Sequence, residues 1–284
     1  MGVNSTRKIK RIIGLLAISA KMDLVWLMRD TKFALAAILA DTISNLSVVS
    51  SVYLIALRFG GIGNMSVDEV LFMMAYSTIT TGLFILFGSG NNIHISRIIG
   101  RGQLEHLFMQ PLTLKTQLMT SGFTPFTGSG NFIIGCILLM IAVNRLHFQI
   151  TLWWMIWLII YLLATVVIIV ARAYLVSSAA FYAPVAAEEI STTAIEGTWQ
   201  LSTFPLSGMP GFIQISLLTI MPEGLMAWFP TLCLLGKSPL NFTEYYPLVY
   251  ALIIAIVANY IFRKGLIFYV KKGSNRYVPY GFRR

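Results

Sequence analysis

Long apolar runs separated by short polar segments set the pattern of this chain. Six runs approach the roughly 20 residues that a helix needs to cross a bilayer. We predict spans at 33–57, 70–91, 117–143, 152–175, 212–221 and 246–262. The predicted fold class is therefore an all-α polytopic membrane protein with six transmembrane helices, organised as one transmembrane domain over residues 1–284.

The fifth run is short, and Pro222 separates it from a further apolar segment at 223–235. Two full spans do not fit between Phe212 and Leu235. We predict one short span followed by a re-entrant helix at 223–235, which is allowed at membrane depth where protein or a water-filled cavity covers the backbone. The alternative is one long helix that is kinked at Pro222.

The N-terminal segment 6–27 has the pattern of an amphipathic helix. Its apolar residues follow the spacing i, i+3, i+4 and i+7, and basic residues occupy the other side; the apolar set is Ile9, Ile12, Ile13 and Leu16. This pattern is typical of a helix that lies in the membrane interface. The alternative is a basic tail that only sets the orientation of the chain.

Composition and charge agree with a membrane protein. The chain is 57% hydrophobic and 11% charged, and its mean hydropathy is +0.76, whereas soluble domains carry roughly 25% charged residues. With six spans, eighteen of the 21 Lys and Arg residues fall on one side. The net charge of +10 is thus explained by the positive-inside effect rather than by a nucleic-acid partner, and it predicts that both termini are cytoplasmic.

A patterned polar segment at 97–112 lies between the second and third spans. Leu104, Leu107 and Phe108 are spaced i, i+3 and i+4, Gly102 precedes them and Pro111 follows. The intervening positions are mostly polar, with Gln103, Glu105, His106 and Gln110. We predict a short amphipathic helix in the cytoplasm, suited to docking into a groove on a partner protein.

The stretch from Gly102 to Leu112 resembles the coupling-helix region of ABC-2-type exporter permeases. Further segments are similar to the permease branch that includes viologen exporters; they are Thr203–Ser207, Leu217–Pro222, Trp228–Gly236, Gly265–Tyr269 and Gly273–Arg276. Thr231 departs from that pattern, which usually has alanine there. The resemblance covers the order of elements over nearly the whole chain.

The resemblance implies the membrane-spanning half of an ABC exporter in a bacterial plasma membrane. The chain would bind no cofactor and catalyse nothing covalent, because ATP and Mg would belong to two copies of a cytoplasmic ATPase. It would pair with a second related permease as a heterodimer, or with itself. The residues expected to contact the ATPase are Gly102, Gln103, Leu104, Glu105, His106, Leu107, Phe108 and Pro111. The substrate class implied is a small hydrophobic or cationic compound; a lipid, a glycan or a peptide is the alternative.

Three polar residues are candidates for the substrate path: Asp41 and Asn45 in the first span, and Glu223. An acid inside the membrane should face protein or water, so Asp41 either lines a path for a cation or forms a hydrogen bond between spans. Glu223 either contributes to an extracytoplasmic gate or caps the N-terminus of the re-entrant helix.

Two further features point away from catalysis. Glu188-Glu189 is similar to the paired glutamates of intramembrane proteases, but Thr193 stands where that pattern has arginine. Gly236-Lys237 ends like a phosphate-binding loop without the required preceding glycine. A membrane-embedded enzyme and an ion-coupled secondary transporter remain the competing hypotheses.

The small-residue segment 121–130 is expected to pack closely, with a hinge as the alternative.

Overall fold

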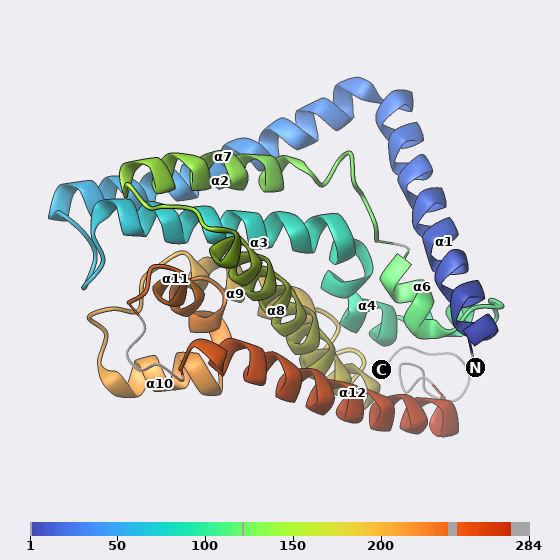
Figure 1. Cartoon of the computed structure of the whole chain (residues 1–284). Coiled ribbons are helices and arrows are strands. Elements are labelled where there is room, and N and C mark those ends of the chain that lie inside the picture. Colours follow the sequence, from blue (N-terminus) through green and yellow to red (C-terminus); the bar gives the residue numbers. More distant parts are fainter. Residues whose placement is uncertain (1, 121, 238–242, 274–284) are drawn as a thin grey trace.

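The computed structural model describes residues 2–120, 122–237 and 243–273, and these contain helices and no strand (Figure 1). The helices are α1 (Gly2–Arg29), α2 (Thr31–Phe59), α3 (Val67–Ile93), α4 (Ile95–Gly100), α5 (Leu104–Phe108), α6 (Leu114–Thr120), α7 (Gly130–Arg145), α8 (Leu152–Ser177), η1 (Ser178–Phe181), α9 (Ile190–Ser202), α10 (Gly211–Thr219), η2 (Pro222–Leu225), α11 (Trp228–Leu234), η3 (Thr243–Tyr245) and α12 (Tyr246–Lys272).

Helix α3 is the centre of the bundle. Of its apolar span, 72% is buried inside the molecule, compared with 11% of the span in α2. Two glycines let α3 and α7 pack backbone to backbone: a Cβ on Gly82 would lie 2.3 Å from the nitrogen of Phe132, and one on Gly135 would lie 2.6 Å from the nitrogen of Ile79. Helix α2 thus leaves most of its apolar surface for lipid or another chain.

The expectation of six spans is not confirmed. Within the described residues, four helical segments are long and apolar enough to cross a membrane: Thr31–Phe59, Val67–Phe87, Leu152–Phe181 and Thr243–Lys272. The pair of Gly211–Thr219 and Pro222–Leu234 qualifies together as a fifth. The chain is therefore a multi-pass membrane protein with four to five apolar spans.

The predicted third span, 117–143, is not one continuous helix. Helix α6 ends at Thr120, and α7 has only 16 residues, or about 24 Å, against the roughly 30 Å of a hydrocarbon core. Around Pro125 the chain is held instead by Asp23 of α1. Its carboxylate accepts hydrogen bonds from the backbone nitrogens of Phe126 at 2.8 Å and Thr127 at 3.2 Å. Satisfied amides of this kind let a non-helical segment persist between α6 and α7.

The segment after α10 turns sharply at Pro222. Helix α10 ends at Thr219, and the axis of Pro222–Leu234 is bent by 72° from it. One continuous helix with a proline kink is therefore wrong. Most of α11 is buried, and the expected range of 223–235 falls on η2 and α11 together; its re-entrant position in the membrane stays a prediction.

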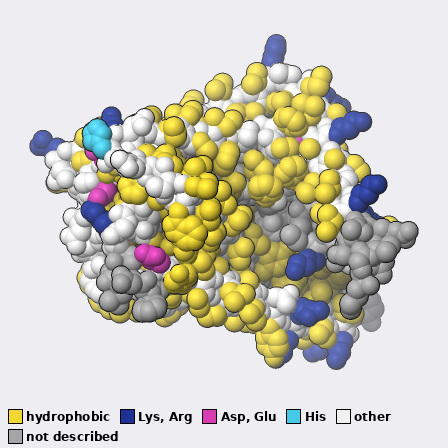
Figure 2. All heavy atoms as spheres, viewed as in Figure 1, with side chains coloured by type: hydrophobic (Ala, Val, Ile, Leu, Met, Phe, Trp, Pro, Cys, Tyr) yellow, Lys and Arg dark blue, Asp and Glu magenta, His cyan; other side chains and the backbone are white. Residues whose placement is uncertain are grey.

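The first helix runs at a steep angle to α2 and returns toward α4 and α6 (Figure 1). It extends over the expected 6–27 and exposes Ile9 and Ile13. We call the end of the molecule where α1 begins and α12 ends the basic end, because Lys and Arg side chains gather there beside a broad hydrophobic face (Figure 2). An exposed apolar stripe at this end fits the interfacial position predicted for α1, which stays a prediction.

Candidate coupling platform and polar groove

Helices α4 and α5 form a platform at the basic end, joined by a tight turn at Gly102. Gly102 has φ +72°, and its amide donates to the carbonyl of Ile99 at 3.1 Å while Gln103 donates to Ile98 at 3.0 Å. These two bonds are the Schellman pattern that ends a helix on a left-handed residue, which explains the glycine. The α4–α5 platform (residues 95–108) therefore owes its geometry to Gly102.

The α5 helix has one inward and one outward face. Leu104 is fully buried against α4 and α12, so it supports the helix from beneath and offers no surface to a partner. The outward face carries Glu105 and His106, and the exposed apolar side chains next to them are Phe108 at 42% and Met109 at 76%. Docking through α5 would thus rest on Phe108 and Met109.

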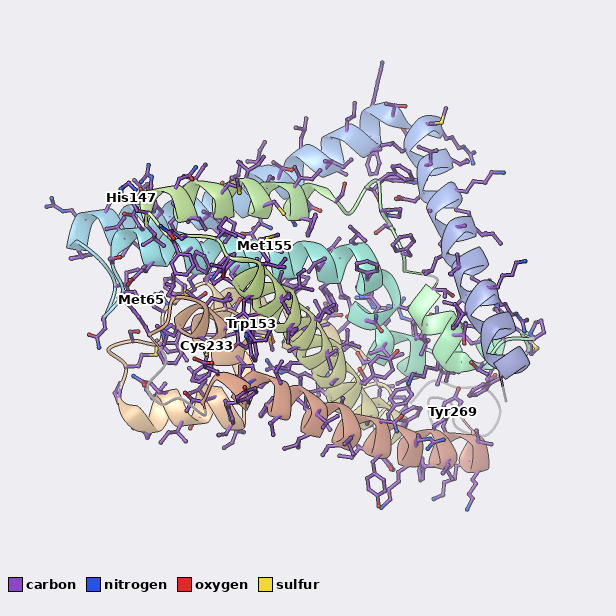
Figure 3. The ribbon with its side chains drawn as sticks, viewed as in Figure 1. Met65, His147, Trp153, Met155, Cys233 and Tyr269 are labelled. Carbon is purple, nitrogen blue, oxygen red and sulfur yellow. The ribbon has the colours of Figure 1, made fainter. Side chains whose placement is uncertain are left out.

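Helix α12 supports α5 through Tyr269, which is labelled at the basic end in Figure 3. Its hydroxyl donates to Oε1 of Glu105 at 3.4 Å, and its ring lies 6.5 Å from that of Phe108. Phe181 packs beside Tyr269 because Gly265 has no side chain: a Cβ there would lie 2.2 Å from the Phe181 ring. This contact explains the Gly265–Tyr269 pattern seen in the sequence.

A buried joint connects α4 with the start of α9. The Ser96 and Ser191 hydroxyl oxygens lie 2.8 Å apart, and each backbone nitrogen donates to the other residue's hydroxyl at 3.2 Å. The Ser96 hydroxyl also donates to the carbonyl of Glu188 at 2.7 Å, and the Ser191 hydroxyl reaches that of Ile93 at 2.7 Å. The α4–α9 joint (Ser96 and Ser191) is therefore fixed by several bonds rather than by one.

Two ion pairs flank this joint. Arg97 holds the Glu189 carboxylate with both Nε and Nη2, at 2.8 and 2.6 Å, and Arg101 Nε lies 2.6 Å from Oε1 of Glu188. The hydrogen bond from Arg97 lowers the pKa of Glu189 below its ordinary value. The paired glutamates are thus each held by an arginine of α4 or of its C-terminal cap.

His94 lies at the boundary of α3 and α4, beside Thr192. Its Nδ1 is 3.4 Å from the Thr192 hydroxyl. Burial, and then the positive charge of Arg97, lower the pKa of this imidazole from its ordinary value. The neutral form of His94 is therefore favoured where α4 meets α9.

A groove of about 400 Å³, which we call the polar groove because nine of its lining residues are polar although most of its surface is apolar, opens between α2, α3, α7 and α9. Its lining residues are Asp41, Ser44, Asn45, Val48, Val49, Met74, Ser77, Thr78, Thr81, Ile85, Asn131, Trp199, Gln200, Thr203 and Phe204. The structure thus brings the predicted path residues Asp41 and Asn45 into one cavity. The Asp41 carboxylate has no ion pair or hydrogen bond within the described ranges, and its role as a path residue stays a prediction.

Glu223 lies apart from the groove. It is 2% exposed at the start of η2, and its carboxylate forms an ion pair with Arg172 of α8, whose guanidinium also donates to Thr198 of α9. The expected helix cap is not its observed contact. Arg172 was missed in the sequence because a single arginine near the end of an apolar run gives no sign of its partner.

Comparison with known families decides the identity. A family model described as "ABC-2 family transporter protein" matches residues 45–273. The chain belongs to the ABC-2 transporter family. It is a membrane component of an ABC transporter, associates with ABC ATPase subunits, and is not itself catalytic. Comparisons with curated proteins and with solved structures gave no match.

The motifs that suggested an ABC-2 permease meet in space. Trp228 donates from Nε1 to the Ser207 hydroxyl at 2.9 Å, which joins two segments of the pattern. Gly236 has φ +68° and ends α11 as Gly102 ends α4. Residues 274–276 of the tail pattern lie outside the described residues. The described residues contain no group of three side chains suited to a metal ion.

Proposed function

We propose that this permease is half of the translocation pathway of an ATP-driven exporter of a small hydrophobic or cationic compound. A separate ATPase would dock on the exposed face of α5. The observation that carries the proposal is α9: Ser191 at its first turn binds the α4–α5 platform, and Trp199 and Gln200 near its other end line the polar groove. One helix of 13 residues thus contacts both the α4–α5 platform, through Ser96 of α4, and the cavity.

Helix α9 connects the α4–α5 platform to the groove, so that a displacement of the platform reaches the groove through one helix. A displacement of α4 moves α9 because the serine joint and two ion pairs hold them together. Near its far end, α9 bonds Arg172 through Thr198 and α3 through Ser202, whose hydroxyl is 3.3 Å from that of Ser77. A rigid helix anchored at both ends transmits displacement instead of absorbing it.

The pathway needs a second permease. Helix α2 forms one wall of the groove and buries only 11% of its apolar span, so a second chain would cover it. A related permease as a heterodimer is our first choice, and a homodimer is the alternative. Two ATPase subunits would supply ATP and Mg, in a bacterial plasma membrane with both termini cytoplasmic, as the basic charge of the two ends favours.

Copurification tests the proposal. The tagged full chain, extracted from its native membrane in a mild detergent, should bring down an ATP-hydrolysing subunit. The double variant Phe108→Ala, Met109→Ala should lower the recovered ATPase by about tenfold or more, since exposed apolar anchors dominate docking energies. The control Met22→Ala, also exposed but on α1, should not. Recovery of no ATPase in any preparation would refute the function; equal recovery from all variants would refute α5 as the docking site.

A further inference from the structure

Two residues that line the polar groove each have a buried polar atom without a partner. Asn131 of α7 is 6% exposed, and its Oδ1 accepts no hydrogen bond; the indole Nε1 of Trp199 donates none. Buried polar atoms are nearly always paired, so the unused acceptor of Asn131 favours an occupant that donates a hydrogen bond. Both residues line the cavity that Asp41 and Asn45 also line.

The charge at the groove selects a cation. Asp41 and Asn131 both also line a smaller pit of about 10 Å³, together with Thr42 and Thr127. This volume fits about one water molecule, which is close to the size of an ammonium head. The pit is therefore lined by two residues whose side chains carry acceptor oxygens, Asp41 and Asn131, at a place where only a small group enters.

The rest of the groove suits an apolar body. Val48, Met74, Ile85 and Phe204 contribute apolar surface, and the Trp199 ring is fixed edge-on to Phe84 with ring centroids 6.1 Å apart. An aromatic ring held in place can stack on an aromatic ligand or face a cation. A cavity of about 400 Å³ is within the range of sites for small molecules.

We propose that the groove binds a primary or secondary ammonium attached to an aromatic body, with the N–H groups donating to Asp41 and to Oδ1 of Asn131. Two acceptors require a ligand with N–H donors. A quaternary ammonium has the charge but no hydrogen to donate, and a neutral alcohol has the donor but no charge. The groove therefore prefers the protonated amine over both. This assignment rests on the proposed function, since it names the substrate class of the same pathway.

Three indole compounds separate charge from hydrogen bonding. Tryptamine carries a primary ammonium, its N,N,N-trimethyl derivative a quaternary one, and tryptophol a neutral hydroxyl. Binding to the full-length permease, purified with whatever subunits accompany it and placed in lipid nanodiscs, is measured by calorimetry. Tryptamine should bind at least about tenfold more tightly than the other two, as the loss of a charge-assisted hydrogen bond predicts.

Matched variants locate the site. Asp41→Asn should weaken tryptamine binding by about tenfold to a hundredfold, and Asn131→Leu by about tenfold. Asp30→Asn removes the same charge from an aspartate between α1 and α2, outside the groove, and should change nothing. Folding of each variant is checked by its elution as a single species.

The outcomes distinguish this inference from the proposed function. Three results would overturn the ammonium site. They are equal affinity for tryptamine and the quaternary compound, no measurable tryptamine binding, and tryptamine binding that is unchanged in Asp41→Asn. If an ATPase copurifies in the same preparations, the exporter proposal stands without that site. Selective amine binding without any copurifying ATPase keeps the site and overturns the exporter.

Discussion

The hydroxyl oxygens of Ser96 and Ser191 lie 2.8 Å apart, and both residues are fully buried. Through this contact the α4–α5 platform and the helix that lines the groove share one rigid point. A bond between two short side chains tolerates little movement, because neither has a long stem that could follow. A shift of α4 must therefore move α9 or break the joint.

Ser96→Ala tests this joint. The substitution removes the hydroxyl that donates to the Glu188 carbonyl and accepts from the Ser191 amide. Leaving such groups unpaired costs about 1–3 kcal/mol, so the thermal midpoint should fall. Ser47→Ala is the control, because that exposed hydroxyl only donates to the carbonyl of Ile43 one turn earlier. An unchanged thermal midpoint for Ser96→Ala would show that the hydrogen bonds of Ser96 do not stabilise the folded protein.

Gly102→Ala should strain the turn between α4 and α5. A left-handed conformation costs a residue with a Cβ about 1–2 kcal/mol, and Gly102 has φ +72°. Proteolysis within residues 100–110 should therefore become faster. Gly14→Ala in α1 is the matched control: its Cβ meets nothing within 4 Å, and alanine should stabilise that helix by about 0.5–1 kcal/mol. Unchanged cleavage in Gly102→Ala would contradict the Schellman turn.

Arg172→Met should be the most destabilising of these substitutions. It leaves the Glu223 carboxylate buried without its cation, which costs about 3–5 kcal/mol. Adding Glu223→Gln removes the buried charge and should restore much of that loss. A double-mutant cycle on thermal midpoints measures the coupling. Additive effects of the two substitutions would mean that the ion pair does not stabilise the protein.

The α4–α9 joint should weaken in acid. The pKa of His94 is lowered in the folded chain, so below the ordinary value of 6.5 the unfolded state binds a proton that the folded state does not. Above that pH His94 is neutral in both states and does not lower the free energy of unfolding. As the pH falls below that value, the free energy of unfolding declines. The lowered pKa of Glu189 adds a second loss at still lower pH.

Thermal midpoints between pH 7.5 and 5.5 measure the His94 contribution. His94→Gln should flatten the decline over this window, whereas His106→Gln, at an exposed position of α5, should leave it unchanged. A decline of equal size in all three proteins would assign the pH dependence to other groups.

Hydrophobic length predicted the long helices well. The runs at 33–57, 70–91, 152–175 and 246–262 lie inside α2, α3, α8 and α12. The run at 117–143 failed as a single helix because Asp23, about a hundred residues earlier in the chain, binds the amides around Pro125. Such a contact has no signature in local periodicity, although the cluster of glycine and proline marked where it would occur.

The site was predicted in outline. The pattern of residues 102–111 located α5, but the i, i+3, i+4 stripe did not distinguish a partner-facing side from a buried one, and Leu104 is buried. Asp41 and Asn45 are the polar candidates predicted in the first span, and both line the groove. The Ser96–Ser191 contact was beyond sequence reasoning, because two serines 95 positions apart carry no pairing signal.

A separate ATPase is expected to contact the outer face of α5 and Met109, which directly follows it. A photo-crosslinking amino acid placed at Met109, which is 76% exposed, tests this contact in intact membranes. We expect a crosslink to an ATP-binding subunit from position 109 and none from position 22 on α1. Two results are incompatible with this contact. In the first, position 109 crosslinks only to lipid or to other permease chains; in the second, the ATPase crosslinks equally from positions 109 and 22.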